Sequence, residues 1–164
     1  MENYIVINGK RAELTKEQLI ALGIEIKKED LFDFKNNDYY FINNVGEVIR
    51  DYHSDGCPIS MLRHNTANYC TNKILMEQRA LHETLNRLLW RYSMQHNSDE
   101  MDWFDIDQFK YCIYYHAFEG KYKVDVNQCC KTQGAVYFIS EEVAEDAIEK
   151  VVKPFIEQYP EFEW

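Results

Sequence analysis

The side chains of this chain that could carry covalent or metal chemistry are few, and their spacing does not form a catalytic arrangement. The five cysteines are an odd number and include no Cys-x-x-Cys pair, which argues against a disulfide framework. They are Cys57, Cys70, Cys112, Cys129 and Cys130, and we expect most of them to be small buried residues. None of the five histidines has a spacing to a cysteine that would mark a nucleophile with its base. The sequence therefore predicts no catalytic residue.

The run DYHSDGC is the best candidate for metal or cysteine chemistry, because it holds His53, Asp55 and Cys57. All three residue types ligate metal ions, but structural zinc sites usually show paired ligand spacing. Gly56 and Pro58 instead favour a polar turn at this point. We therefore expect no metal and no cofactor, and an enzyme that uses His53, Asp55 and Cys57 is a third hypothesis.

The acidic residues show the most informative spacing. The net charge is −10, and residues 98–164 hold 15 Asp and Glu against 6 Lys, whereas residues 1–97 hold 13 against 12 Lys and Arg. The candidate partner-binding residues form two groups, which are Asp99, Glu100, Asp102, Trp103 and Asp105, and Glu142, Glu145, Asp146 and Glu149. A surface of this sign attracts basic proteins and makes direct binding of nucleic acid unfavourable. The alternative interpretation is a solvated acidic surface without a partner.

Hydrophobic periodicity and turn residues predict the elements that position these groups. The first half begins with a hairpin at 4–14, whose turn is Asn8-Gly9, and a helix from Thr15 to a stop at Gly23. A connector at 25–38 leads to a second hairpin, which pairs 39–42 with 47–52. A loop at 53–68 and a long helix at 72–95 complete this half. In the second half they are a hairpin pairing 110–115 with 121–126, a strand at 135–139 and a helix that begins after Ser140. Pro154 lacks the amide donor of a helix interior, so we expect this last helix to kink or to restart near Lys153.

These elements predict an α+β fold of antiparallel β-hairpins packed against amphipathic helices. The two halves show a weak repeat, because an alignment of Tyr69 with Tyr137 also places Asn72 on Ser140, and both of these residues are good helix caps. A duplicated β-β-β-α unit would explain the repeat. The expected parts are an N-terminal hairpin, helix and connector at 1–37, a first β/helix unit at 38–97, an acidic linker at 98–109 and a second β/helix unit at 110–164, as one compact chain or as two small subdomains.

Membrane and secretion signals are not expected in this chain. No run approaches the roughly 18 consecutive apolar residues of a membrane span. The N-terminus, MENYIVINGK, becomes polar too early for a signal peptide. Together with the unpaired cysteines, these features predict a cytoplasmic protein.

Several segments of the chain resemble uncharacterised accessory proteins of phages and prophages of low-GC Gram-positive bacteria. The segments are INGKRAELTKEQLIALG, YYFINNVGEV, Arg63 with NYCTNKILMEQ, and KYCIYY followed by GAVYFISEEVAEDAIE, and the resemblance covers about three quarters of the chain. Because small accessory phage proteins often antagonise host defence, the resemblance implies an anti-defence role, such as anti-CRISPR inhibition, in the cytoplasm of the bacterial host.

Two functions of different classes follow from these observations. The first is a non-enzymatic inhibitor that binds a basic, nucleic-acid-handling host defence protein, such as a CRISPR effector nuclease, by presenting an acidic surface as a DNA mimic. The alternative is a protein that binds and sequesters a small molecule or nucleotide second messenger in a pocket lined by its aromatic hairpins.

Overall fold

The computed structural model describes residues 4–7, 10–22, 30–32, 38–53, 56–98 and 100–164 of the chain. Its elements are helices and antiparallel sheets, which confirms the predicted α+β fold. The chain divides into two compact units, residues 1–33 and 34–164, and each is described by itself. The predicted turn at Asn8-Gly9, the stop at Gly23 and most of the connector at 25–38 lie outside the described residues.

The first unit contains the predicted hairpin and short helix. Strands β1 (Tyr4–Ile7) and β2 (Lys10–Glu13) pair antiparallel, and α1 (Lys16–Ala21) follows them. The helix begins with a capping box, in which the Gln18 amide donates to the Thr15 hydroxyl at 3.3 Å and the Thr15 amide donates to the Gln18 side chain at 2.8 Å. Two amides that a helix start would otherwise leave unpaired are thereby satisfied.

The second unit begins with the predicted tyrosine-rich hairpin. Strands β3 (Asp38–Ile42) and β4 (Val48–Tyr52) pair antiparallel. The Asn43 side chain shapes the turn between them, because its oxygen accepts the amides of Val45 at 3.0 Å and Glu47 at 2.9 Å.

The expected loop at 53–68 is wrong, because α2 (Pro58–Asn65) lies within it. Pro58 occupies the first turn of this helix, where a missing amide donor costs little. The helix has no sequence signature because its apolar residues Ile59, Met61 and Leu62 are exposed rather than aligned toward the core.

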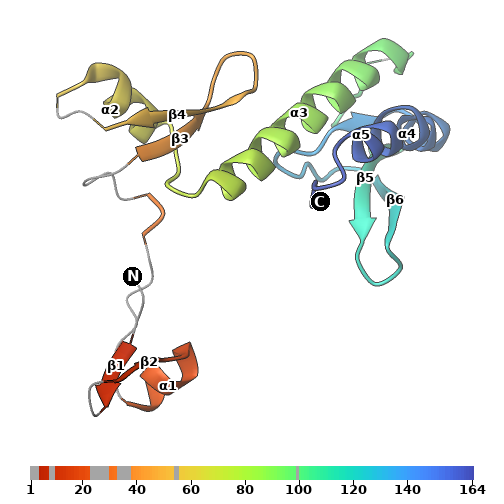
Figure 1. Cartoon of the computed structure of the whole chain (residues 1–164). Coiled ribbons are helices and arrows are strands. Elements are labelled where there is room, and N and C mark those ends of the chain that lie inside the picture. Colours follow the sequence, from red (N-terminus) through yellow and green to blue (C-terminus); the bar gives the residue numbers. More distant parts are fainter. Residues whose placement is uncertain (1–3, 8–9, 23–29, 33–37, 54–55, 99) are drawn as a thin grey trace. The chain divides into compact units, whose positions relative to one another are not determined.

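The long helix is confirmed as α3 (Lys73–His96), and it extends from the β3–β4 hairpin to the C-terminal helices (Figure 1). Its first turn is capped by Asn72, whose side chain accepts the Leu75 amide at 3.1 Å. Three arginines of this helix, Arg79, Arg87 and Arg91, are exposed.

The C-terminal part of the second unit is a three-stranded antiparallel sheet followed by a helix. Strands β5 (Lys110–His116), β6 (Lys121–Asn127) and β7 (Tyr137–Phe138) lie in the order β6-β5-β7, and the third strand is shorter than predicted. Helix α4 (Glu141–Ala147) begins where expected, because the Ser140 hydroxyl accepts the amide of the third helical residue at 3.3 Å.

The last helix changes its winding before Pro154. A π-helical segment, η1 (Ile148–Val152), joins α4 to α5 (Lys153–Gln158), and the Lys153 amide donates to the carbonyl five residues back. In a regular α-helix the proline would leave the Lys150 carbonyl without a donor and would crowd it with its ring. The wider turn avoids this clash, and α5 restarts at Lys153 as predicted.

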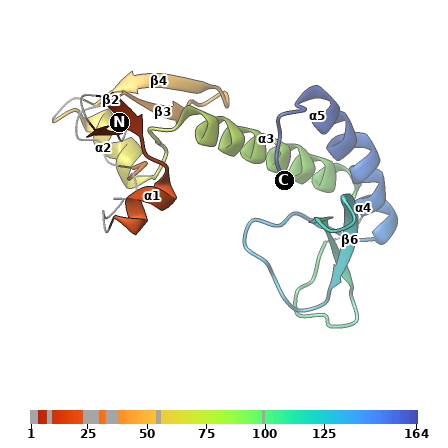
Figure 2. The ribbon, with the colours of Figure 1, turned by 60° about the horizontal axis from the view of Figure 1, so that its bottom comes forward.

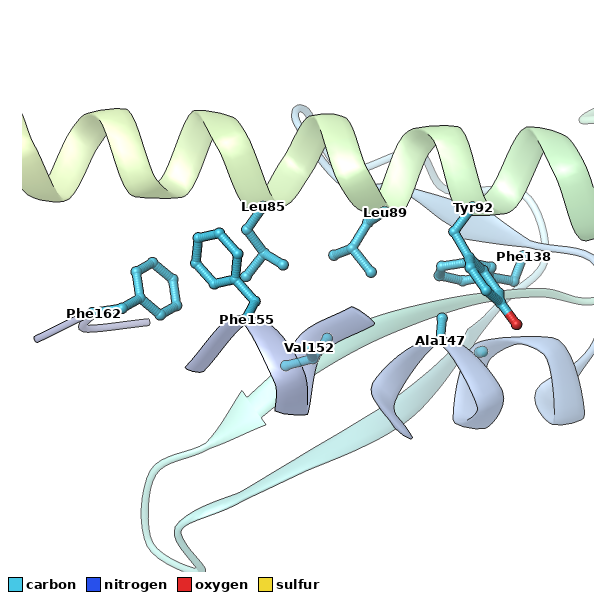
Figure 3. Packing of buried hydrophobic residues seen from close by; sticks show 9 residues of the cluster. Leu85, Leu89, Tyr92, Phe138, Ala147, Val152, Phe155 and Phe162 are labelled. Carbon is cyan, nitrogen blue, oxygen red and sulfur yellow. The ribbon is translucent and has the colours of Figure 1, made fainter. Parts of the chain in front are cut away.

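The main core of the second unit lies where α3 packs on the helical run from α4 to α5 (Figure 2). Side chains from α3 point toward side chains from the run and from β7 (Figure 3). The buried members of this core are Leu85, Leu89, Tyr92, Phe138, Ala144, Ala147, Val152, Phe155 and Phe162. The helical run is therefore buried on one side and leaves its other side available for a site.

The two halves of the second unit repeat one pairing pattern. In each half a third segment pairs antiparallel with the first strand of the hairpin, on the edge that the second strand does not use. The paired residues are Tyr40 with Cys70, and Tyr111 with Phe138. A helix cap follows two residues later in both halves, at Asn72 and Ser140. The topology agrees with the aligned caps, and duplication of the unit stays a prediction.

Candidate functional site

A groove of about 940 Å³ lies between the start of β6 and the outer side of the helical run from α4 to α5. Its lining holds five carboxylates and two ammonium groups, which belong to Glu142, Glu145, Asp146, Glu149, Glu157, Lys121 and Lys153. Gly120, Tyr122, Ile148 and Ile156 complete its wall. The structure therefore brings all four predicted residues of the 142–149 group into one concave surface, which we call the acidic groove.

The amphipathic pattern of the helical run explains why these carboxylates face the groove. Ala144, Ala147 and Val152 are fully buried in the core. The acidic residues at 142, 145, 146 and 149 repeat at spacings of three and four residues, so they share the side of the helix away from those positions.

Asp146 is the most firmly held carboxylate of the acidic groove. It accepts a hydrogen bond from the Lys150 ammonium at 2.6 Å and another from the Tyr92 hydroxyl. The Lys150 bond and the Tyr92 bond lower the pKa of Asp146. Burial and the neighbouring carboxylate raise the pKa of Tyr92 to about 12. Asp146 is therefore a fixed anion at neutral pH, oriented by a core residue.

The remaining carboxylates of the acidic groove are held less tightly. Glu149 pairs with Lys153 across one helical turn. The pKa of Glu142 is lowered by its own backbone amide and by the Ser140 hydroxyl at the helix start. Within the described residues Glu145 and Glu157 form no ion pair, so their charges are open to a partner.

The described residues of the second predicted acidic group lie in a loop that is held by hydrogen bonds. The Asp102 carboxylate accepts the Phe104 amide at 2.8 Å, and the Asp105 carboxylate accepts the Asp107 amide at 2.9 Å. The Asp102 amide donates a hydrogen bond to the Gln108 side chain at 2.8 Å, and this bond joins the two ends of the loop. These contacts hold the carboxylates in local turns of the kind that aspartate favours. Asp99 lies outside the described residues, and Glu100 is exposed.

Trp103, the aromatic residue of the second acidic group, is half-buried and lies against the sheet. Its ring meets the Tyr137 ring edge-on at 4.7 Å between centroids, and the Lys131 ammonium lies 4.6 Å from it. The exposed aromatic residue of this loop is its neighbour Phe104, which is 96% exposed. The sequence gives no sign of which of two adjacent aromatic residues packs inward.

The described residues of the two acidic groups lie on opposite faces of the β6-β5-β7 sheet. Successive residues of a strand point to opposite faces. Phe138 is buried in the core beside α4, so its neighbour Tyr137 faces the other way, and Trp103 packs on Tyr137. A single groove therefore does not hold both groups, and the acidic groove contains the 142–149 group alone.

Comparison with protein-family models, with curated proteins and with solved structures finds no match. Within the described residues no helix is both long enough and apolar enough to cross a bilayer.

Sequence reasoning missed the contributions of Glu157, Lys121 and Tyr122 to the acidic groove. Glu157 lies eight residues after Glu149, but Pro154 falls between them, so the sequence did not predict that one helix face continues to Glu157. Lys121 and Tyr122 come from a strand far away in the sequence, so only the folded structure places them beside the helical run.

The third hypothesis, an enzyme built on Cys57, receives one supporting feature. Cys57 immediately precedes α2, and the nearby amide and hydroxyl of Ser60 lower the pKa of its thiol. Asp55 lies outside the described residues, and no cluster of three metal-ligating side chains occurs in the part of the chain that is described.

Cys57 is expected to react with iodoacetamide at pH 7 at least several-fold faster than Cys112. The thiolate is the nucleophile, and burial raises the pKa of Cys112, whereas that of Cys57 is lowered. Peptide mass spectrometry after short exposures measures the two rates. In concentrated urea the rates should converge, and equal rates in the native protein would contradict the assignment.

Proposed function

We propose that this protein binds the basic surface of a nucleic-acid-handling protein in its acidic groove and blocks that surface without catalysis. The observation that carries the proposal is the convergence of five carboxylates on one groove. The resemblance to phage and prophage proteins makes a host defence nuclease, such as a CRISPR effector, the expected class of partner.

The spacing of the carboxylates supports a role as a DNA mimic. Carboxylates three or four residues apart on a helix lie about 5–6 Å apart. Each strand of duplex DNA presents one phosphate every roughly 3.4 Å along the axis. The spacing of the carboxylates and that of the phosphates are of the same order. The long side chains of Lys and Arg that hold a phosphate backbone can therefore also reach this row of carboxylates. The start of β6, which is an edge strand of its sheet within the described residues, borders the row.

The double variant Glu145→Lys with Glu157→Lys is expected to weaken binding of the partner at least tenfold, or about 1.4 kcal/mol. Both residues are exposed and form no ion pair within the described part of the chain, so the change reverses the field of the groove without breaking an internal contact. The matched control, Asp107→Lys with Asp125→Lys, alters the net charge equally at exposed positions outside the groove lining. Binding to the purified partner is measured by titration.

The partner itself is identified by a pull-down of the tagged protein from a lysate of a bacterium that carries defence systems. Recovery of a basic nuclease at low salt and its loss at high salt is expected, because salt screens interactions between exposed charges. Equal weakening by the groove variant and by the control variant would show that net charge, and not the acidic groove, causes binding.

The alternative function, sequestration of a nucleotide second messenger, requires a pocket that accepts negative charge. The acidic groove is unfavourable for phosphate, because its carboxylates outnumber its ammonium groups. A ligand-dependent rise in melting temperature across a nucleotide panel would favour this alternative over the proposal.

A further inference from the structure

Cys129 and Cys130 occupy adjacent positions in the loop between β6 and β7, and both are exposed. Their Sγ atoms lie 4.0 Å apart. Adjacent side chains of an extended chain point in opposite directions. The conformation of this loop therefore brings together two thiols that a strand would separate. The expectation that most of the cysteines are buried is wrong, because only Cys70 is buried, whereas Cys57 and Cys112 are partly exposed and this pair is exposed.

The loop that carries the two thiols is held by Tyr137. The hydroxyl of Tyr137 accepts the Thr132 amide at 2.7 Å and lies 3.5 Å from the Cys130 carbonyl, to which it donates. The ring of Tyr137 is in turn packed against Trp103. The backbone on the C-terminal side of the pair is thus held to the sheet. Less conformational entropy is therefore lost when the two thiols bind a ligand.

The distance between the sulfurs suits a shared metal ion better than a disulfide. A disulfide requires about 2.05 Å between sulfurs and usually 4.4–6.8 Å between Cα atoms, whereas consecutive Cα atoms are about 3.8 Å apart across a trans peptide. Two sulfurs that each lie about 2.3 Å from one ion are about 3.8 Å apart at a tetrahedral angle and about 4.0 Å apart at a trigonal angle. The observed 4.0 Å between Cys129 and Cys130 falls within this range.

We propose that Cys129 and Cys130 form a two-thiolate site for a soft, thiophilic cation, of which Cu(I) is the best fit. Soft thiolate ligands select Cu(I) over hard cations. A structural zinc site needs four protein ligands, and no cluster of three His, Cys, Asp or Glu occurs within the described residues. A cation that is satisfied by two thiolates and one further small ligand matches what the loop offers.

Binding replaces two S–H bonds by two S–Cu bonds and releases two protons to solvent, with no change in oxidation state. Both thiols lose their protons when the ion enters, because the thiolate and not the thiol is the metal ligand. Proton release therefore distinguishes chelation by both thiols, which frees about two protons per ion, from binding by a single thiol, which frees about one.

The test is an anaerobic titration of the reduced full chain with Cu(I) against a chromophoric Cu(I) chelator. We expect one ion per chain and about two protons released, and the single variants Cys129→Ser and Cys130→Ser should each bind at least about 100-fold more weakly, because chelation is lost. The matched control, Cys57→Ser with Cys112→Ser, should retain the affinity of the parent. Single variants that bind as tightly as the parent, or a control that loses binding, would overturn the proposal.

Discussion

Replacement of Phe138 by alanine is expected to lower the free energy of unfolding of the second unit by about 3–5 kcal/mol. Phe138 is 0% exposed and belongs to the core between α3 and the helical run. It also stands in the short strand β7, which is joined to α3 where the Ser93 hydroxyl donates to the Tyr137 carbonyl at 2.6 Å. The loss combines the transfer of the ring to water with the cavity left behind, which helices on both sides cannot fill without moving.

Urea denaturation followed by circular dichroism measures this loss, and Phe118→Ala is the matched control. Phe118 is 97% exposed in the turn between β5 and β6, so its truncation should change stability by less than about 0.5 kcal/mol. A similar loss in both variants would mean that phenylalanine content, and not this core, determines stability.

The elements of this fold follow from the sequence wherever a local signal and burial agree. Ser140 and Asn72 begin their helices as predicted, because a side-chain oxygen there satisfies an amide that has no partner within the helix. The restart at Lys153 follows from the chemistry of Pro154 alone. In contrast, α2 was missed because its apolar side chains face outward and leave no periodic pattern.

The candidate site could be predicted only in part, because sheet geometry decides which side chains share a surface. The spacing of the 142–149 group places its carboxylates together on one helix, and the structure agrees. Whether Trp103 and its acidic neighbours join them depends on which face of the sheet Tyr137 occupies. A shift of β7 by one residue along β5 would place Tyr137 on the opposite face of the sheet. No residue in the sequence indicates which of the two registers forms.

Arg63→Ala is the substitution outside the main core with the largest expected effect, a loss of about 2–3 kcal/mol. Arg63 of α2 donates to the Tyr39 hydroxyl at 2.7 Å, forms an ion pair with Asp51 of β4, and stacks its guanidinium 3.4 Å from the centre of the Phe41 ring. Its side chain is only 18% exposed. These contacts tie α2, which has few buried residues of its own, to the hairpin.

The control for Arg63 is Arg91→Ala, because Arg91 is exposed on α3 and forms no ion pair within the described residues. It should change stability by less than about 0.5 kcal/mol. Equal small losses in the two variants would mean that α2 is held by other contacts. A loss in Arg63→Ala that Arg63→Lys restores would assign the effect to charge, whereas failure of lysine to restore it would assign it to the planar guanidinium on Phe41.

The dependence of this loss on pH separates the ion pair from the ring contact. The hydrogen bond and charge of Arg63 lower the pKa of Asp51 below its usual 3.8. The carboxylate therefore stabilises the folded state above the unfolded pKa, and this contribution is lost as the pH falls through the lower folded value. The difference in unfolding free energy between the parent and Arg63→Ala should be largest near pH 7 and should shrink below about pH 3.8. A difference that stays constant from pH 7 to pH 3 would show that stacking on Phe41, and not the pair with Asp51, anchors α2.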